Sequence, residues 1–270
     1  MKKPRIKLLI SDVDGTLLTS NHVLTEQSTR AVKQLGDAGI LFAITSGRPP
    51  RGLSMLIDPL RLTTPLGAFN GGLIVDCDMN FLQELTIPDN LVTPIIELLS
   101  ANGLSVWVYQ GSDWFVLDLN GPHVLHNSRA CQFTPSEVTN FNEINRRVVK
   151  IVGVSDEPSV MRIVEAKLQH QFGHDVSATR SSAYYLDVTH RDANKGAVVH
   201  FFSSKFDIAT ADIATIGDMS NDLLMFEMSG LSIAMGNADG DVQHAADHVS
   251  RSNDDDGFAY AIDQFILNSQ

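Results

Sequence analysis

The chain has 270 residues, of which 43% are hydrophobic and 19% charged, and it carries a formal net charge of −12. This length allows one large or two modest domains, and the composition is ordinary for a globular protein. The negative charge argues against sequence-independent binding to nucleic acid or to anionic membranes, because both require a basic surface. Small anionic substrates stay open, since a bound divalent cation can reverse the local field.

The cysteines and the apolar segments both favour a cytoplasmic protein. Cys77 and Cys131 have no metal-ligand spacing and are typical of thiols in a reducing compartment. The apolar run near the start, ending Leu8-Leu9-Ile10, is too short for the core of a signal peptide, and no stretch approaches the length of a membrane span. We therefore expect a cytoplasmic location.

The N-terminal segment has the pattern of a strand, a helix and a second strand. An apolar strand is expected over residues 6–10 and a second one over 40–44. A helix is expected between them over 25–38, with Thr25 as its N-cap and Gly39 after its end. Such a unit predicts a parallel sheet with a right-handed crossover.

The C-terminal third repeats this alternation, which is typical of α/β folds. In chain order we expect a helix over 196–204, a strand over 213–216, a helix over 223–228, a strand over 231–235, and helices over 239–246 and 258–267.

The middle of the chain has a different pattern. We expect strands over 104–109, 114–119 and 148–154, with helices over 91–101 and 159–172. The short loop between the first two strands predicts an antiparallel hairpin. The fold class is therefore α/β: a Rossmann-like parallel-sheet core of residues 1–84 and 188–270, with an inserted α+β (α/β) domain of residues 85–187.

Acidic residues follow two of the predicted core strands, where parallel sheets bind ligands. Asp12 and Asp14 come after the first strand and point the same way, because side chains in extended backbone alternate. Asp218, Asn221 and Asp222 come after the strand over 213–216. Grouped carboxylates favour a cation, and Mg²⁺ prefers oxygen ligands. A solvated loop would also explain the first pair, and helix capping would explain Asn221 or Asp222, but not Asp218.

A hydroxyl and a lysine lie at other expected strand ends and helix starts. Ser46 and Gly47 follow the second strand, where a hydroxyl and free N–H groups suit a phosphoryl oxygen. Lys195 precedes a helix and can neutralise charge on a transferring phosphoryl group. Alone, the first would be an ordinary turn and the second a solvated lysine. Together with the acidic groups they predict a site for phosphoryl transfer.

These motifs resemble those of the haloacid dehalogenase-like hydrolase superfamily and, within it, the Cof-type sugar-phosphatase branch. The matching segments are Asp12-Val13-Asp14-Gly15-Thr16, Ser46-Gly47-Arg48-Pro49, Asn194-Lys195-Gly196 and Gly217-Asp218-Met219-Ser220-Asn221-Asp222, with Phe69-Asn70-Gly71-Gly72 as an Asn-Gly element. The resemblance covers both ends of the chain, whereas the middle matches in length and position only. Ser46 stands where many relatives carry Thr, which keeps the hydroxyl.

The resemblance implies an aspartyl-phosphate formed on Asp12, with Asp14 as general acid and then general base. The acid role requires a raised pKa at Asp14. Mg²⁺ would be held by the Asp12 carboxylate, the Asp14 carbonyl and Asp218, with Asp222 close behind them. The phosphoryl oxygens would be bound by the Val13 and Gly47 N–H groups, Ser46, Lys195 and Asn221, and Arg48 and Asn70 are candidate substrate contacts.

The predicted protein is thus a magnesium-dependent phosphatase acting on small phosphate monoesters, sugar phosphates or related metabolites. The inserted domain would be a cap that excludes water and supplies most of the substrate selectivity. A phosphomutase would use the same motifs. A phospho-accepting signalling module would lack the acid two residues after the nucleophile, and a metal-dependent glycosyltransferase would not explain Lys195. The sequence does not predict the oligomeric state.

Overall fold

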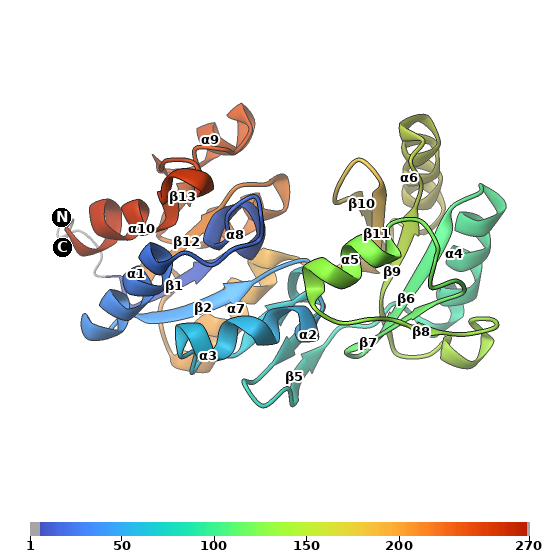
Figure 1. The fold of residues 1–270 in the computed structure, drawn as a ribbon, viewed down its shortest axis with the longest axis horizontal. Helices are drawn as coiled ribbons and strands as arrows, with labels where there is room; N and C mark the ends of the chain where they lie inside the picture. The colour runs from blue at the N-terminus through green and yellow to red at the C-terminus, as the bar shows by residue number, and fades with distance from the viewer. Residues whose placement is uncertain (1–5, 269–270) are drawn as a thin grey trace.

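Two β-sheets, each covered by helices, lie next to each other along the longest axis of the molecule (Figure 1). The structure is a computed structural model, and residues 6–268 are described. Within these residues the larger sheet has eight strands and the smaller sheet six. Across the same span, none of the helices combines the length and the apolar character needed to cross a bilayer.

The larger sheet is formed by segments from both ends of the chain. Its strands, in spatial order, are β14 (His248–Val249), β13 (Leu231–Ala234), β12 (Ile213–Gly217), β1 (Leu8–Ser11), β2 (Leu41–Thr45), β3 (Leu66–Ala68), β4 (Leu73–Val75) and β5 (Phe81–Glu84). The strands from β14 to β3 are parallel, which confirms the Rossmann-like core. The pairs β3–β4 and β4–β5 are antiparallel, an extension that the apolar patterns did not reveal.

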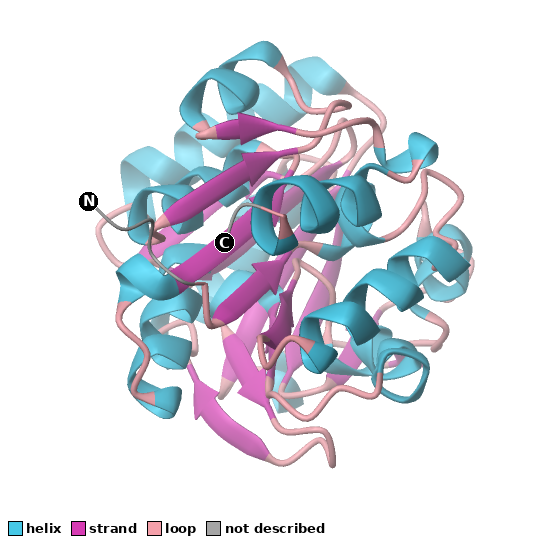
Figure 2. Ribbon diagram, turned by 90° about the vertical axis from the view of Figure 1, so that its left-hand side faces the viewer, coloured by secondary structure: helices cyan, strands magenta, loops and turns pink. Residues whose placement is uncertain are grey.

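Helices cover both faces of the larger sheet (Figure 2). They are α1 (Glu26–Asp37), α2 (Pro50–Leu53), α3 (Ile57–Leu60), α7 (Lys195–Phe206), α8 (Leu223–Met228), α9 (Gly240–Ala245) and α10 (Gly257–Ala261), which continues as the wide helical turn Ile262–Leu267. Strand β1 shows why both faces are covered: Leu9 packs in the cluster that contains Leu35, whereas Leu8 and Ile10 pack with Phe202 on the other side.

Side-chain caps position the helices that begin next to the sheet. The Thr25 hydroxyl accepts a hydrogen bond from the Ser28 N–H at 3.0 Å, as expected of an N-cap. The Asn194 side chain accepts one from the Ala197 N–H at 2.9 Å, so α7 begins at Lys195. The cap therefore fixes where the Lys195 side chain leaves the helix.

The smaller sheet lies between β5 and α7 in the chain, which confirms an inserted α+β unit. Its strands, in spatial order, are β10 (Val176–Arg180), β11 (Tyr185–His190), β9 (Val148–Val154), β6 (Ser105–Gln110), β7 (Asp113–Val116) and β8 (Ser136–Glu137). The β6–β7 hairpin pairs Gln110 with Asp113 in antiparallel register, as expected. Because β11 ends at His190, we propose that the second junction with the core follows this strand.

One face of the smaller sheet packs on two helices. The helices of this unit are α4 (Asp89–Ala101), α5 (Val124–Cys131) and α6 (Pro158–Phe172). Val108, Ile151 and Leu186 pack with residues of α4 and α6 in a separate hydrophobic cluster. The residues of the opposite face join the cluster of the larger sheet, where Tyr109 contacts Phe69 with ring centroids 5.1 Å apart. The second face is therefore directed at the core.

Candidate active site at the carboxyl ends of the core strands

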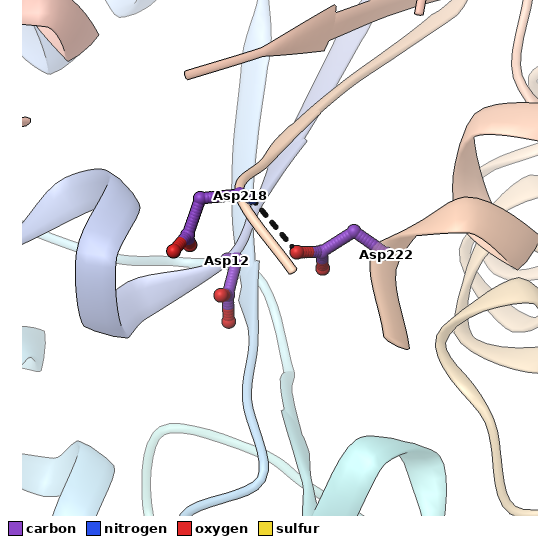
Figure 3. A group of neighbouring side chains, drawn as sticks. All are labelled: Asp12, Asp218 and Asp222. Atoms are coloured by element: carbon purple, nitrogen blue, oxygen red, sulfur yellow. Dashed lines mark hydrogen bonds between the residues drawn. The ribbon is translucent and has the colours of Figure 1, made fainter. Parts of the chain in front are cut away.

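Three buried aspartates converge where β1 and β12 end. Asp12 follows β1, and its N–H donates to the carbonyl of Ile216 on the neighbouring strand at 2.9 Å. Asp218 follows β12, and Asp222 ends the helical turn after it. Their carboxylates each offer an oxygen within 4.8 Å of the others (Figure 3). Parallel pairing of β1 with β12 thus brings two distant acidic motifs together.

Lys195 partly neutralises this acidic group. Its Nζ lies 2.7 Å from Asp12 Oδ1 and 2.6 Å from Asp222 Oδ1, and the side chain is fully buried. Burial alone would lower the pKa of Lys195, but the two carboxylates hold it above its usual value. The lysine is therefore a permanent ammonium beneath Asp12, not the solvated helix-start residue that its sequence context also allowed.

Asp222 holds the loop together instead of facing a ligand. Its Oδ2 accepts hydrogen bonds from the N–H groups of Asp218 and Met219, both at 2.9 Å, and its Oδ1 binds Lys195. Figure 3 shows its carboxylate directed at the backbone of Asp218. Because both oxygens already have strong donors, Asp222 is poorly placed as a metal ligand even though it belongs to the acidic group.

Asp12 and Asp218 offer oxygens that suit a divalent cation. Burial, and to a lesser extent Asp222, raise the pKa of Asp218 to about 6, while Thr16 and Asn237 donate to its oxygens at 2.8 and 3.4 Å. Burial also raises the pKa of Asp12, although Lys195 opposes this. Crowded carboxylates whose charged forms are disfavoured are relieved by a cation. The oxygen donors therefore fit a hard ion such as Mg²⁺.

Gly15 lets the Asp12 loop approach Asp218. Its φ is +77°, and a Cβ at this position would collide with the Asp218 carboxylate. We expect Gly15→Ala to displace Asp218 and to destabilise the fold by about 1 kcal/mol or more, from the left-handed backbone alone. Chemical denaturation and metal titration would measure the two effects. Gly36→Ala is the matched control, because a Cβ there meets nothing within 4 Å; equal effects of the two changes would contradict this role.

Asp14 is held as an ionised carboxylate. Arg48 donates from Nε and Nη2 at 2.7 and 2.6 Å, and His22 Nδ1 lies 3.0 Å away. Burial would raise the pKa of Asp14, but the hydrogen bonds from His22 and Arg48 hold it well below its usual range. The expectation of a raised pKa is therefore wrong for this arrangement, because sequence did not reveal that both partners converge on this carboxylate.

Arg48 joins the core to the inserted unit. Besides binding Asp14, its Nη1 donates to the carbonyl of Gly52 at 3.2 Å and to that of Ala130, in α5, at 2.9 Å. The side chain is 6% exposed. As a candidate substrate contact, Arg48 lies in the right place, but its donors already have partners within the protein.

A constrained turn places Asn70 beside Ser46. Phe69 and Asn70 have φ values of +50° and +55°, a region that is costly for a side chain as large as phenylalanine. The turn is held by hydrogen bonds from the Phe69 N–H to the Arg48 carbonyl at 3.0 Å and from the Asn70 N–H to the Ser46 carbonyl at 2.8 Å. Asn70 Oδ1 in turn accepts from Asn221 Nδ2 at 3.2 Å.

A cavity of about 210 Å³ lies between the two sheets, at the carboxyl ends of the core strands. Of the predicted site residues, its lining includes Asp12, Asp14, Ser46, Gly47, Arg48, Asn70 and Asn221. Lys195, Asp218 and Asp222 are not in this lining but bond to one another or to Asp12. Val13 packs its side chain in the hydrophobic core, so only its backbone is available to a ligand.

Residues 9–262 match the family model described as haloacid dehalogenase-like hydrolase. The chain belongs to the haloacid dehalogenase-like hydrolase family. The match spans the core, the inserted unit and all four motifs.

Named relatives and a solved structure match nearly the whole length of this family member. A candidate phosphatase of Haemophilus influenzae is 31% identical, with 96% of this chain and 97% of the relative covered. The 5-amino-6-(5-phospho-D-ribitylamino)uracil phosphatase of Bacillus subtilis is 27% identical, covering 97% and 98%. A haloacid dehalogenase-like hydrolase from Bacteroides thetaiotaomicron superposes with a TM-score of 0.88 at 27% identity, covering 96% and 99%. The chain is thus a haloacid dehalogenase-like phosphatase.

Several residues of this haloacid dehalogenase-like site were not predicted. Asn237 donates to Asp218 and, at 2.9 Å, to the Gly15 carbonyl, and its place just after β13 could have marked it, since the other motifs also follow strands. Lys150 and Asp187 line the cavity from the inserted unit. A lysine in the middle of the apolar strand Val148–Val154 was the available signal for that side of the site.

Proposed function

We propose that this phosphatase hydrolyses small phosphate monoesters, sugar phosphates or related metabolites, through an aspartyl-phosphate on Asp12 and with Mg²⁺ as cofactor. The observation that carries the proposal is the position of Asp12. Its carboxylate lines the cavity, is bound by Lys195, lies beside Asp218, and precedes Asp14 by two residues. The proposed nucleophile therefore lies close to a positive charge, to a second carboxylate that could bind a cation, and to the proposed proton-transfer group.

In the proposed first step, an Asp12 oxygen attacks phosphorus and the ester bond to the alcohol breaks. In the second, water attacks phosphorus and releases Asp12 and inorganic phosphate. The phosphoryl oxygens would be bound by Ser46, Lys195, Asn221 and the Val13 and Gly47 N–H groups. Fixed donors of this kind stabilise charge that develops in the transition state.

We propose that Asp14 is the general acid of the first step and the general base of the second. Its ionised form can accept a proton from the hydrolytic water, although the hydrogen bonds from Arg48 and His22 that lower its pKa also weaken it as a base. Donating a proton to the leaving alcohol requires it first to become protonated, which Arg48 and His22 oppose in the present arrangement. Both proton transfers would therefore require those hydrogen bonds to weaken when substrate occupies the cavity.

The metal is proposed to be held by the Asp12 carboxylate, the Asp14 carbonyl and Asp218. When bound, Mg²⁺ would shield the carboxylate from the phosphate it attacks and offset charge in the transition state. Asp222 would stabilise Asp218 from behind, because its oxygens bind two backbone N–H groups and Lys195.

Release of inorganic phosphate from a panel of aryl and sugar phosphates tests the proposal. We expect turnover with Mg²⁺, loss of turnover with EDTA, and recovery when Mg²⁺ is added back. Conversion of a sugar monophosphate to its isomer only when a bisphosphate is added would favour the phosphomutase alternative. Failure to release phosphate from any ester in the presence of Mg²⁺ would reject the proposed function.

We also propose that the enzyme acts in the cytoplasm. Cys77 and Cys131 are both free thiols, which suits a reducing compartment. The proposed substrates are small phosphorylated metabolites that would bind within the site, so the enzyme needs no basic surface elsewhere to bind them.

A further inference from the structure

Two asparagines close a ring of hydrogen bonds around the loop that follows Asp12. Asn237, just after β13, donates from Nδ2 to the Gly15 carbonyl at 2.9 Å, and its Oδ1 accepts from the Asn253 N–H at 3.0 Å. Asn253 lies buried between β14 and α10 and donates from its own Nδ2 to the Leu18 carbonyl at 2.9 Å. Both ends of the segment from Gly15 to Leu18 are therefore held by one pair of side chains from the C-terminal part of the chain.

The amide of Asn237 fits this ring in one orientation. Its oxygen faces the N–H of Asn253 and its nitrogen faces the carbonyl of Gly15, so exchanging the two would set like groups against each other. The same nitrogen also donates to Asp218 Oδ2 at 3.4 Å. One exposed side chain thus joins three segments that lie far apart in the sequence.

Asn237 and Thr16 hold the Asp218 carboxylate from two sides. The Thr16 hydroxyl donates to Oδ1 at 2.8 Å, whereas Asn237 donates to Oδ2. A carboxylate with a donor on each oxygen cannot rotate without losing one of them, and each oxygen keeps a lone pair for a cation. Because Gly15 directly follows Asp14, whose carbonyl is a proposed metal donor, the bond to Gly15 holds that donor in place relative to Asp218.

We infer that Asn237 is a positioning residue for the metal site, and that Asn253 holds it in place from the C-terminal loop. Asn237 acts through Asp218 and the loop after Asp12, because its own oxygen and nitrogen are already engaged. Mg²⁺ requires near-ideal octahedral geometry, so its affinity depends on how closely the spacing of its donors is fixed. The inference rests on the proposed use of Mg²⁺.

Asn237→Ala tests the inference through Mg²⁺ affinity, which titration calorimetry of the full chain measures without turnover. We expect the dissociation constant for Mg²⁺ to rise about tenfold or more, as is typical when a group that orients a metal ligand is removed. At saturating Mg²⁺, the KM for p-nitrophenyl phosphate should stay at the wild-type value, because the cavity lining does not include Asn237. Thermal unfolding without divalent ions should change little, because the side chain is exposed.

Asn80→Ala is the matched control, because Asn80 is an asparagine of the core whose Nδ2 also donates to a carboxylate, that of Asp76, at 3.0 Å. Its Mg²⁺ affinity should equal that of the wild type. Asn253→Ala removes the bond to Leu18 but keeps the backbone N–H that holds Asn237, so it should raise the dissociation constant less than Asn237→Ala does. If Asn237→Ala does not fold, Asn237→Ser, which keeps a hydroxyl, should shift the affinity in the same direction.

An unchanged dissociation constant in a folded Asn237 variant would overturn the inference, and so would an equal rise in Asn80→Ala. A wild type that binds no Mg²⁺ would overturn the proposed cofactor and the inference together. A wild type that binds Mg²⁺ but releases phosphate from no ester would overturn the proposed function alone, since the calorimetric comparison does not depend on turnover.

Discussion

Asp12→Asn should abolish the magnesium-dependent hydrolysis of an aryl phosphate such as p-nitrophenyl phosphate while the fold stays intact. An amide cannot attack phosphorus as a carboxylate does, and loss of a covalent nucleophile costs roughly 10³-fold or more in kcat. Asparagine has the same shape, and Lys195 keeps its ion pair with Asp222 at 2.6 Å. Continuous assay of aryl phosphate turnover, with thermal unfolding in parallel, would measure both consequences.

Asp239→Asn provides the comparison for this experiment. Asp239 is an exposed aspartate that precedes α9 and makes no side-chain capping bond. We expect it to keep wild-type turnover. Undiminished hydrolysis by Asp12→Asn would show that another group attacks phosphorus. If Asp12→Asn loses both turnover and folding, Asp12→Glu is the variant to measure instead, because it keeps the charge but displaces it.

Asp222→Ala should be among the most destabilising single changes in this protein, by about 3–5 kcal/mol in the free energy of unfolding. The substitution leaves Lys195 buried with one carboxylate instead of two and leaves the N–H groups of Asp218 and Met219 without their acceptor. Urea denaturation followed by circular dichroism would measure the change. A loss below 1 kcal/mol would mean that Asp222 does not hold this loop.

Asp218→Asn, four residues before Asp222, should not lower the free energy of unfolding at neutral pH without divalent ions. The pKa of Asp218 is raised to about 6, so the folded state holds its proton more tightly than the unfolded chain does. That contribution to stability is complete below the ordinary pKa of an aspartate and is lost as the pH rises through about 6. At pH 7.5 without divalent ions, Asp218→Asn should therefore be at least as stable as the wild type. The wild type, but not this variant, should gain Tm when Mg²⁺ is added.

The core site was largely predictable because each of its motifs follows a recognisable strand or begins a helix. Asp12, Ser46 and Asp218 lie at carboxyl ends of adjacent parallel strands, so topology alone brings them together. Their partners were harder to find. The pairing of Asp14 with Arg48 and His22 depends on side-chain directions in irregular loops, which no periodicity encodes.

The side of the site formed by the inserted unit was not predictable in the same way. β10 and β11 were missed because both segments are short and rich in polar residues, even though Leu186 and Val188 alternate with Asp187 and Thr189, and Asp187 was missed with them. The edge strand β5 and its neighbour β4 were missed because both are short and β5 is largely exposed. The last helix was expected as one element, but it widens at Ile262, where α10 changes into a looser turn.

The hydrogen bond from Arg48 to the Ala130 carbonyl links the position of α5 to the acid–base chemistry of the core. A movement of α5 away from the core would remove one acceptor from the guanidinium and free it to shift. Because that guanidinium also helps to keep Asp14 ionised, the proton affinity of Asp14 would change with the same movement. Such a linkage is reciprocal: protonation of Asp14 must in turn bias the separation of the two sheets. Separation of the two sheets, which would release the alcohol, and the return of Asp14 to its ionised form would then be coupled in a single equilibrium.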